Sequence, residues 1–178
     1  MLFAAVAVAI LATIAVTVGA PPAEAHDHQI PETVLKKGSR DLQTGLKVAE
    51  SVWVYSLGGG RCRGEQNLYV FRFPGVDRVA MGSTLRVRIF KEQHPGSFMV
   101  WAHRKVDEDN YPVGKPQALR RTLDPVVWGG KTVAWDARFC MSQPSRDYYL
   151  VTEGHWRDRE GCGGDQYAFW SFHVRTGR

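Results

Sequence analysis

The chain has 178 residues, of which 44% are hydrophobic and 23% are charged, and its formal net charge is +5 at pH 7. This length is typical of one domain, and six Trp, eight Phe and six Tyr supply enough apolar area for a single core. The basic residues are scattered and do not interleave with aromatic residues, so the sequence does not indicate a nucleic-acid-binding surface. The charge indicates solubility and an attraction to anionic cell-wall polymers.

The first 25 residues are typical of a secretory signal peptide. An uncharged apolar run over residues 3–18 is too short to span a bilayer comfortably, and the small-x-small triplet at 23–25 follows it. No Lys or Arg precedes the run, so an uncleaved, membrane-attached signal anchor is the alternative reading. Cleavage after residue 25 would remove Glu24, raise the net charge to about +6 and make His26 the N-terminus. We therefore expect a secreted or envelope-associated domain of residues 26–178.

The apolar residues of this domain recur with a period of two. In the segment 84–91, Leu85, Val87 and Ile89 alternate with polar residues, as in a half-buried strand. Similar runs occur at 48–55, 68–73, 98–104, 131–139, 148–156 and 167–174. Turn clusters rich in Gly, Pro and Ser separate them, and no convincing helix is found.

Seven to eight short strands predict an all-β, immunoglobulin-like sandwich with a single domain. Residues 105–118 and 157–165 are expected to form long loops. The polar segment 29–45 contains two glycines, and we expect it to be a lead-in that crosses the edge of the sandwich.

Two of the three cysteines lie in matching contexts. Cys62 and Cys162 both begin the pattern Cys-x-Gly-acid-Gln, and each precedes an aromatic strand. Two loops that enter neighbouring strands at the same end of a sandwich would bring these sulfurs together, so we expect a disulfide. It would close a loop of about 100 residues, for which chain entropy gives roughly 4 to 5 kcal/mol. Cys140 is expected to be a buried small hydrophobe, and the lack of Cys-x-x-Cys spacing argues against structural zinc.

The common catalytic motifs are missing from the sequence. There is no Gly-x-Ser-x-Gly elbow and no His-Glu-x-x-His pair. The glycine-rich stretch 58–64 lacks the Lys-Ser/Thr and the helix of a phosphate-binding loop. We therefore assign no catalytic residue and expect a protein that binds rather than an enzyme.

Residues 26–28 read His-Asp-His, and cleavage would give His26 a free α-amine beside its imidazole. Two Cu(II) sites can then be written. In the first, the amine, two deprotonated backbone amides and the His28 imidazole form a square-planar nitrogen set, which suits Cu(II) or Ni(II). In the second, the amine and the imidazole of His26 form a chelate that side chains from elsewhere in the fold complete.

The C-terminal part of the chain supplies such side chains. The tripeptide Glu-Gly-His at 153–155 and the closing segment 172–174, together with the N-terminal histidines, resemble the CopC-like copper-binding family. These secreted or periplasmic β-sandwiches begin with His-x-His or a similar pair and carry an acid-Gly-His turn ahead of a closing strand. The resemblance implies Cu(II)-binding roles for His26, Glu153 and His155. The chain departs from the family in having Glu where Asp is usual, in the residues that follow the N-terminal histidines, and in its length and cysteines.

Two other functions remain open. A non-catalytic recognition module would bind protein or polysaccharide through exposed Trp and Tyr, without metal, and His155 would then be a loop histidine beside Trp156. An oxidative copper enzyme with an N-terminal histidine chelate is the third reading, and it would need richer loops than this length allows. His94 and His103 are expected to be solvated or hydrogen-bonded, and His173 is expected to face outward.

Overall fold

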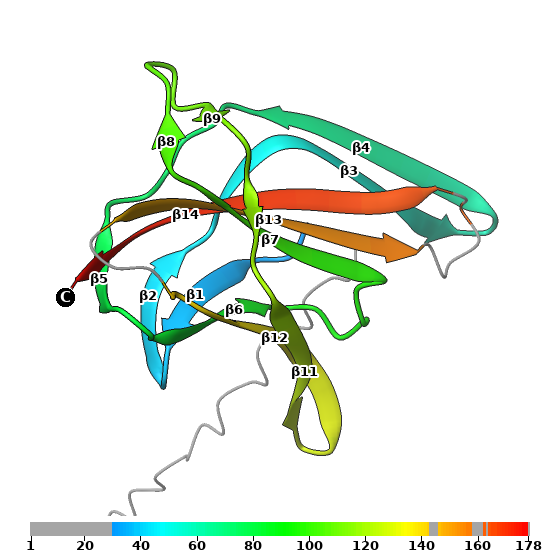
Figure 1. Cartoon of the computed structure of the whole chain (residues 1–178). Coiled ribbons are helices and arrows are strands. Elements are labelled where there is room, and N and C mark those ends of the chain that lie inside the picture. Colours follow the sequence, from blue (N-terminus) through cyan, green and yellow to red (C-terminus); the bar gives the residue numbers. More distant parts are fainter. Residues whose placement is uncertain (1–29, 143–145, 158–161, 163, 178) are drawn as a thin grey trace, which may run out of the picture.

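The computed structural model describes residues 30–142, 146–157, 162 and 164–177, which form fourteen strands and no helix. Figure 1 shows two sheets packed as layers, with a small two-stranded ribbon beside them. The all-β sandwich is confirmed, although the seven to eight strands predicted are fewer than the described residues contain. None of the described residues belongs to a helix long and apolar enough to cross a membrane.

One layer is a five-stranded antiparallel sheet. Its strands, from one edge to the other, are β11 (Arg121–Trp128), β12 (Lys131–Cys140), β6 (Thr84–Ile89), β1 (Thr33–Lys37) and β2 (Arg40–Thr44). The alternation expected over β6 is confirmed, because Leu85, Val87 and Ile89 are completely buried between the layers. Strand β12 places Ala137 and Phe139 in the same core.

The other layer is a seven-stranded sheet. Its main path is β10 (Gln117–Ala118), β7 (Ser97–His103), β13 (Asp147–Arg157), β14 (Asp165–Gly177), β3 (Leu46–Gly58) and β4 (Arg61–Tyr69). The short strand β5 (Asp77–Ala80) pairs in parallel with the end of β14. The ribbon consists of β8 (Lys105–Val106) and β9 (Pro112–Val113), inside the expected long loop.

Three expectations about the strands were wrong. The supposed lead-in forms the hairpin β1–β2, because its few apolar residues alternate and Leu35 enters the core. Strand β11 was missed because Pro125 interrupts its pattern, yet proline is tolerated in an edge strand such as this one. The strand expected at 68–73 ends at Tyr69, since the chain then leaves the sheet.

The segment 70–76 crosses the outer face of the seven-stranded sheet on its way to β5. The hydroxyl of Ser171 on β14 donates to the carbonyl of Arg72 at 2.5 Å. The ring of Phe73 meets that of Tyr149 on β13 edge to face, with centroids 5.0 Å apart. The segment therefore covers the part of this face that lies over β13 and β14 near Ser171.

The core between the layers is dominated by aromatic side chains. Trp53, Trp156 and Trp170 are at most 1% exposed and lie in edge-to-face contact, with centroids 5.4 Å and 6.2 Å apart. Their strands β3, β13 and β14 belong to the seven-stranded sheet. The indole N–H of Trp170 donates to the carbonyl of Pro31 at 3.1 Å, which fixes the start of the described chain under that sheet.

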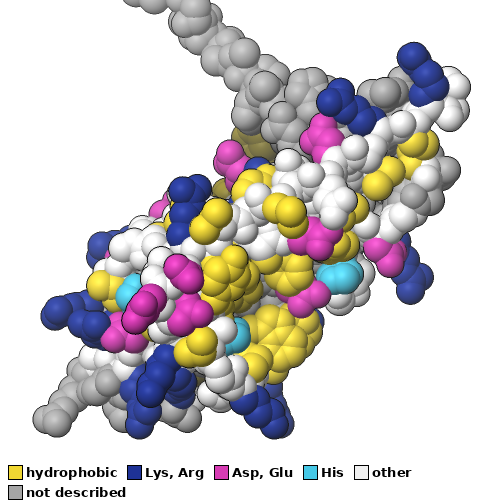
Figure 2. Space-filling view, turned by 90° about the horizontal axis from the view of Figure 1, so that it is seen from above, with side chains coloured by type: hydrophobic (Ala, Val, Ile, Leu, Met, Phe, Trp, Pro, Cys, Tyr) yellow, Lys and Arg dark blue, Asp and Glu magenta, His cyan; other side chains and the backbone are white. Residues whose placement is uncertain are grey.

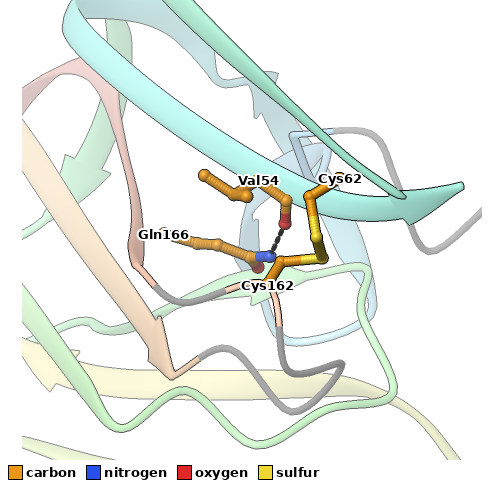
Figure 3. The surroundings of a disulfide bond; sticks show 4 residues. All are labelled: Val54, Cys62, Cys162 and Gln166. Atoms are coloured by element: carbon orange, nitrogen blue, oxygen red, sulfur yellow. Dashed lines mark hydrogen bonds between the residues drawn. A yellow bond between two sulfur atoms is a disulfide. The ribbon is translucent and has the colours of Figure 1, made fainter. Parts of the chain in front are cut away.

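The expected disulfide between Cys62 and Cys162 is confirmed, with Cα atoms 5.6 Å apart. Figure 3 shows it beside the hydrogen bond from the Gln166 side chain to the carbonyl of Val54. Cys62 lies within β4 rather than in a loop, and it joins that edge strand to the residues just before β14. The burial expected for Cys140 was wrong: it ends β12 with an exposed side chain.

Candidate functional site

The outer face of the seven-stranded sheet carries Glu153 and His155, two of the metal ligands that the sequence predicts. Side chains alternate across a strand, so Glu153 and His155 of β13 share the outer face while Gly154 and Trp156 point inward. This sheet is uppermost in Figure 1, and Figure 2 shows the same face from above. Hydrophobic side chains, several with rings, lie there beside histidines and acidic side chains.

Glu153 and His155 touch each other. The Oε1 atom of Glu153 lies 2.7 Å from Nε2 of His155, and the two side chains are 26% and 40% exposed. The other carboxylate oxygen, Oε2, accepts a hydrogen bond of 3.4 Å from the indole N–H of Trp101 on β7. The Glu153 carboxylate is thus held between an indole and an imidazole. The carboxylate and the imidazole both remain accessible from solvent.

Aromatic rings of β14 flank this pair. The imidazole of His155 stacks on the ring of Tyr167, with centroids 5.7 Å apart and planes inclined by 26°. Tyr167 in turn meets Phe169 edge to face at 6.1 Å. We call Trp101, Glu153, His155, Tyr167 and Phe169 the outer-face site. All five are partly exposed, so a ligand on this face would meet rings, a carboxylate and an imidazole together.

A carboxylate of β3 continues the site on the side of Tyr167. Burial raises the pKa of the Tyr167 phenol, and Glu50 raises it further through its charge and a hydrogen bond. Glu50 also accepts a hydrogen bond from the side-chain amide of Gln66 on β4. Polar and aromatic side chains therefore follow one another across β4, β3, β14, β13 and β7.

A glycine beneath the site lets the core approach the sheet closely. A Cβ atom added to Gly154 would lie 2.5 Å from the buried indole of Trp156 and 3.3 Å from that of Trp170. The Trp156 indole cannot easily move away, because it is 1% exposed and its N–H donates to the carbonyl of Gln93 at 3.2 Å. Gly154 is thus needed by the packing that holds Glu153 and His155 in adjacent outward positions.

The same face has a second cluster of charged and aromatic side chains near Asp147. Its carboxylate accepts two hydrogen bonds of 2.8 Å from the Arg175 guanidinium and lies 3.1 Å from Nε2 of His173. Arg175 first and His173 second lower the pKa of Asp147. His173 stacks on Tyr149 at 4.4 Å, and burial lowers the pKa of His103 on the neighbouring strand. The expectation that His173 faces outward is confirmed, although it is largely packed.

The structure brings together some of the predicted site residues and leaves others outside its description. Cys62 and Cys162 are bonded, and Glu153 and His155 are in contact. His26 and His28, like the expected signal peptide, lie outside the described residues. The acid-Gly-His turn implied by the family resemblance was wrong. Residues 153–155 are in the middle of β13, because the alternating inward residues on either side continue the strand.

Trp101, Tyr167 and Phe169 were not predicted as partners of the carboxylate–imidazole pair. Each strand's own alternation places them on one face, and that signal is visible in the sequence. What it does not show is the strand order β7-β13-β14, which sets Tyr167 opposite His155 and Met99 opposite Glu153. The site is created by the pairing of β7 with β13, which are distant in the chain, and by the register between the consecutive strands β13 and β14.

Within the described residues, no three His, Cys, Asp or Glu side chains are grouped as a metal site would require. The pair Glu153–His155 supplies two donor atoms, so a metal held there would need further ligands. Comparison with family models, curated proteins and solved structures finds no match to this chain. The function must therefore be inferred from the residues themselves.

Proposed function

We propose that this protein is exported and binds Cu(II) through its N-terminal histidine, with Glu153 and His155 as ligands from the fold. The observation that carries the proposal is the 2.7 Å separation of Glu153 Oε1 and His155 Nε2. Ligand atoms bind such metals at about 2.0 Å, so two adjacent ligands of a square-planar ion lie about 2.8 Å apart. A carboxylate and an imidazole at this spacing can occupy neighbouring positions with little movement.

The α-amine and imidazole of His26 would supply the two remaining positions. An amine–imidazole chelate with a second imidazole and one carboxylate is a nitrogen-rich set of the kind Cu(II) prefers. The disulfide is typical of proteins that mature outside the reducing cytosol, which agrees with the export that would free this amine. The proposed role is the handling of copper in the envelope or outside the cell.

The position of Pro31 limits how His26 could reach Glu153 and His155. Pro31 lies under the seven-stranded sheet, whereas Glu153 and His155 lie on its outer face. The four residue steps from Ile30 to His26 extend at most about 14 Å. In the proposed site this segment would have to pass by a short path round the edge of the sheet to its outer face. The alternative mode, in which residues 26–28 alone bind Cu(II), requires no such path.

Copper titration of protein that begins at His26 distinguishes these modes. We expect one tight equivalent with a tetragonal, nitrogen-rich spectrum by electron paramagnetic resonance. His155→Ala and Glu153→Gln should weaken the proposed site, and His26→Ala should weaken it most. His94→Ala removes an exposed histidine elsewhere and should change nothing. Binding should also weaken as pH falls through the histidine range, because protons compete with the metal.

Two results would contradict the proposed ligand set. If His28→Ala abolishes binding while His155→Ala leaves it intact, copper is held by residues 26–28 alone. If an extra residue before His26 does not affect binding, the free amine is not a ligand, and both N-terminal modes fail.

The exposed rings favour a second candidate function, a metal-free recognition module for polysaccharide. Trp101, Tyr167 and Phe169 offer partly exposed rings beside a carboxylate that can accept hydrogen bonds from sugar hydroxyls. The test is a pull-down with insoluble cell-wall polysaccharide in the presence of a metal chelator. Retention that Trp101→Ala abolishes would support this function, and no retention would reject it.

A further inference from the structure

The outer face of the five-stranded sheet has a groove that the copper and polysaccharide proposals do not use. It is open, has a volume of about 680 Å³, and lies between the β1–β2 turn and the start of β6, where the Arg86 side chain donates a hydrogen bond to the carbonyl of Gly38. Its lining contains four cationic side chains and no carboxylate: Lys37, Arg40, Arg86 and Arg138, with Gly38, Thr84 and Leu85 between them. We call it the basic groove.

Strand register sets like charges side by side at this groove. Lys36 of β1 is the Cα partner of Arg86 on β6, and Arg86 is the partner of Arg138 on β12. Like charges directly opposite each other in a sheet are destabilising. A row of three cations across three neighbouring strands therefore carries a cost that nearby anions must offset.

The carboxylates nearby offset only part of this charge. Asp136 is shared, since it lies 3.2 Å from Arg86 and accepts two hydrogen bonds, of 2.8 Å and 2.9 Å, from Arg88. Asp124 lies 3.0 Å from Arg138, and Asp41 pairs with Lys36.

Lys37 and Arg40, at the β1–β2 turn, are exposed and form no ion pair with any described residue. The group therefore has six cations for three carboxylates, and the two side chains without a carboxylate line the groove.

We propose that the basic groove binds a polyanion with phosphate groups repeated along its chain. The guanidinium groups of arginine match phosphate oxygens by paired hydrogen bonds, and lysine adds a point charge. The groove is open to solvent rather than closed round one ion, which suits a chain better than a single phosphate. This inference is independent of the copper proposal, because it concerns the opposite layer of the sandwich.

The test uses inorganic polyphosphate as the probe and the whole protein with its native N-terminus. We expect binding at low ionic strength that weakens steeply as salt is added, because exposed charges are screened. The double variant Lys37→Ala/Arg40→Ala should weaken binding about twofold to thirtyfold, because it removes two exposed cations that would each pair with a phosphate. Both side chains are exposed and unpaired, so the fold should be unaffected.

The matched control is Lys105→Ala/Lys115→Ala, which removes the same charge from exposed positions near the β8–β9 ribbon. Polyphosphate binding should be nearly unchanged in this control. Equal losses in both double variants would show that net charge alone attracts the probe, and the groove would be rejected. Binding of polyglutamate as tight as that of polyphosphate would overturn the assignment to phosphate. Failure of the wild-type protein to bind polyphosphate at low salt would overturn the proposal altogether.

Discussion

The side chain of Gln43 connects the two layers where the seven-stranded sheet has a gap. Strand β3 pairs with β14 only as far as Ser171, and β5 begins to pair with β14 at Val174. The backbone N–H and C=O of His173 therefore have no strand partner on this side of β14. Gln43 of β2 fills this gap. Its Oε1 accepts from the His173 N–H at 2.9 Å, and its Nε2 donates to the carbonyls of His173 at 2.6 Å and Gly75 at 2.7 Å.

Replacing Gln43 by leucine should therefore destabilise the fold strongly. The variant keeps the side-chain size but leaves three backbone groups without their partner, and each unmade buried hydrogen bond costs about 1 to 3 kcal/mol. Gly75 is exposed, so its carbonyl can accept a hydrogen bond from water instead. We therefore expect a total loss of about 3 to 5 kcal/mol in the free energy of unfolding.

Urea unfolding followed by tryptophan fluorescence measures this loss as a lower midpoint at unchanged slope. Gln117→Leu on the exposed strand β10 is the control, and it should stay within about 0.5 kcal/mol of the wild type. A loss below 1 kcal/mol for Gln43→Leu would show that water replaces these hydrogen bonds without cost. The reasoning about the gap would then be wrong.

Three further predictions concern stability. Replacing Cys62 and Cys162 together by serine should lower the free energy of unfolding by about 4 to 5 kcal/mol, since the bridge spans 100 residues; an unchanged urea midpoint would refute this. Gly154→Ala should cost about 1 to 3 kcal/mol by overpacking against Trp156, and a thermal midpoint equal to that of the wild type would speak against this packing. Burial lowers the pKa of His103 below 6.5, so the unfolded chain binds more protons and stability should fall as pH drops through 6.5. Denaturant titrations between pH 8 and 5 should show a shallower fall for His103→Gln, and an identical slope would contradict the assignment.

Elements with a strong apolar alternation could be predicted from the sequence, and those with few apolar residues could not. β6, β12, β13 and β14 each place several large side chains in the core, so their period is clear. β1 and β2 are short and carry charged residues on their outer side. From the sequence alone they were therefore predicted to be a lead-in segment rather than strands. β1 joins the sheet by pairing with β6, which lies far along the chain, and β2 joins it as the hairpin partner of β1.

The candidate site shows the same division. Glu153 and His155 were predicted to act together from the family resemblance, and they are in contact because residues two apart in a strand share a face. Trp101 comes from β7, which is a neighbour of β13 only in the fold, Tyr167 depends on the register between β13 and β14, and Gln43 reaches His173 across 130 positions of the sequence. Such contacts depend on strand order and register, which local periodicity does not contain.

The two proposed sites lie on opposite outer faces of the sandwich, which makes their tests independent. The outer-face site belongs to β7, β13 and β14, whereas the basic groove belongs to β1, β2, β6 and β12. A buried core of tryptophans separates them, and sites with no shared partners act additively. Lys37→Ala/Arg40→Ala should therefore leave copper binding unchanged, and His155→Ala should leave polyphosphate binding unchanged. One molecule could then hold on to an anionic polymer with one face while the other face remained open to its ligand.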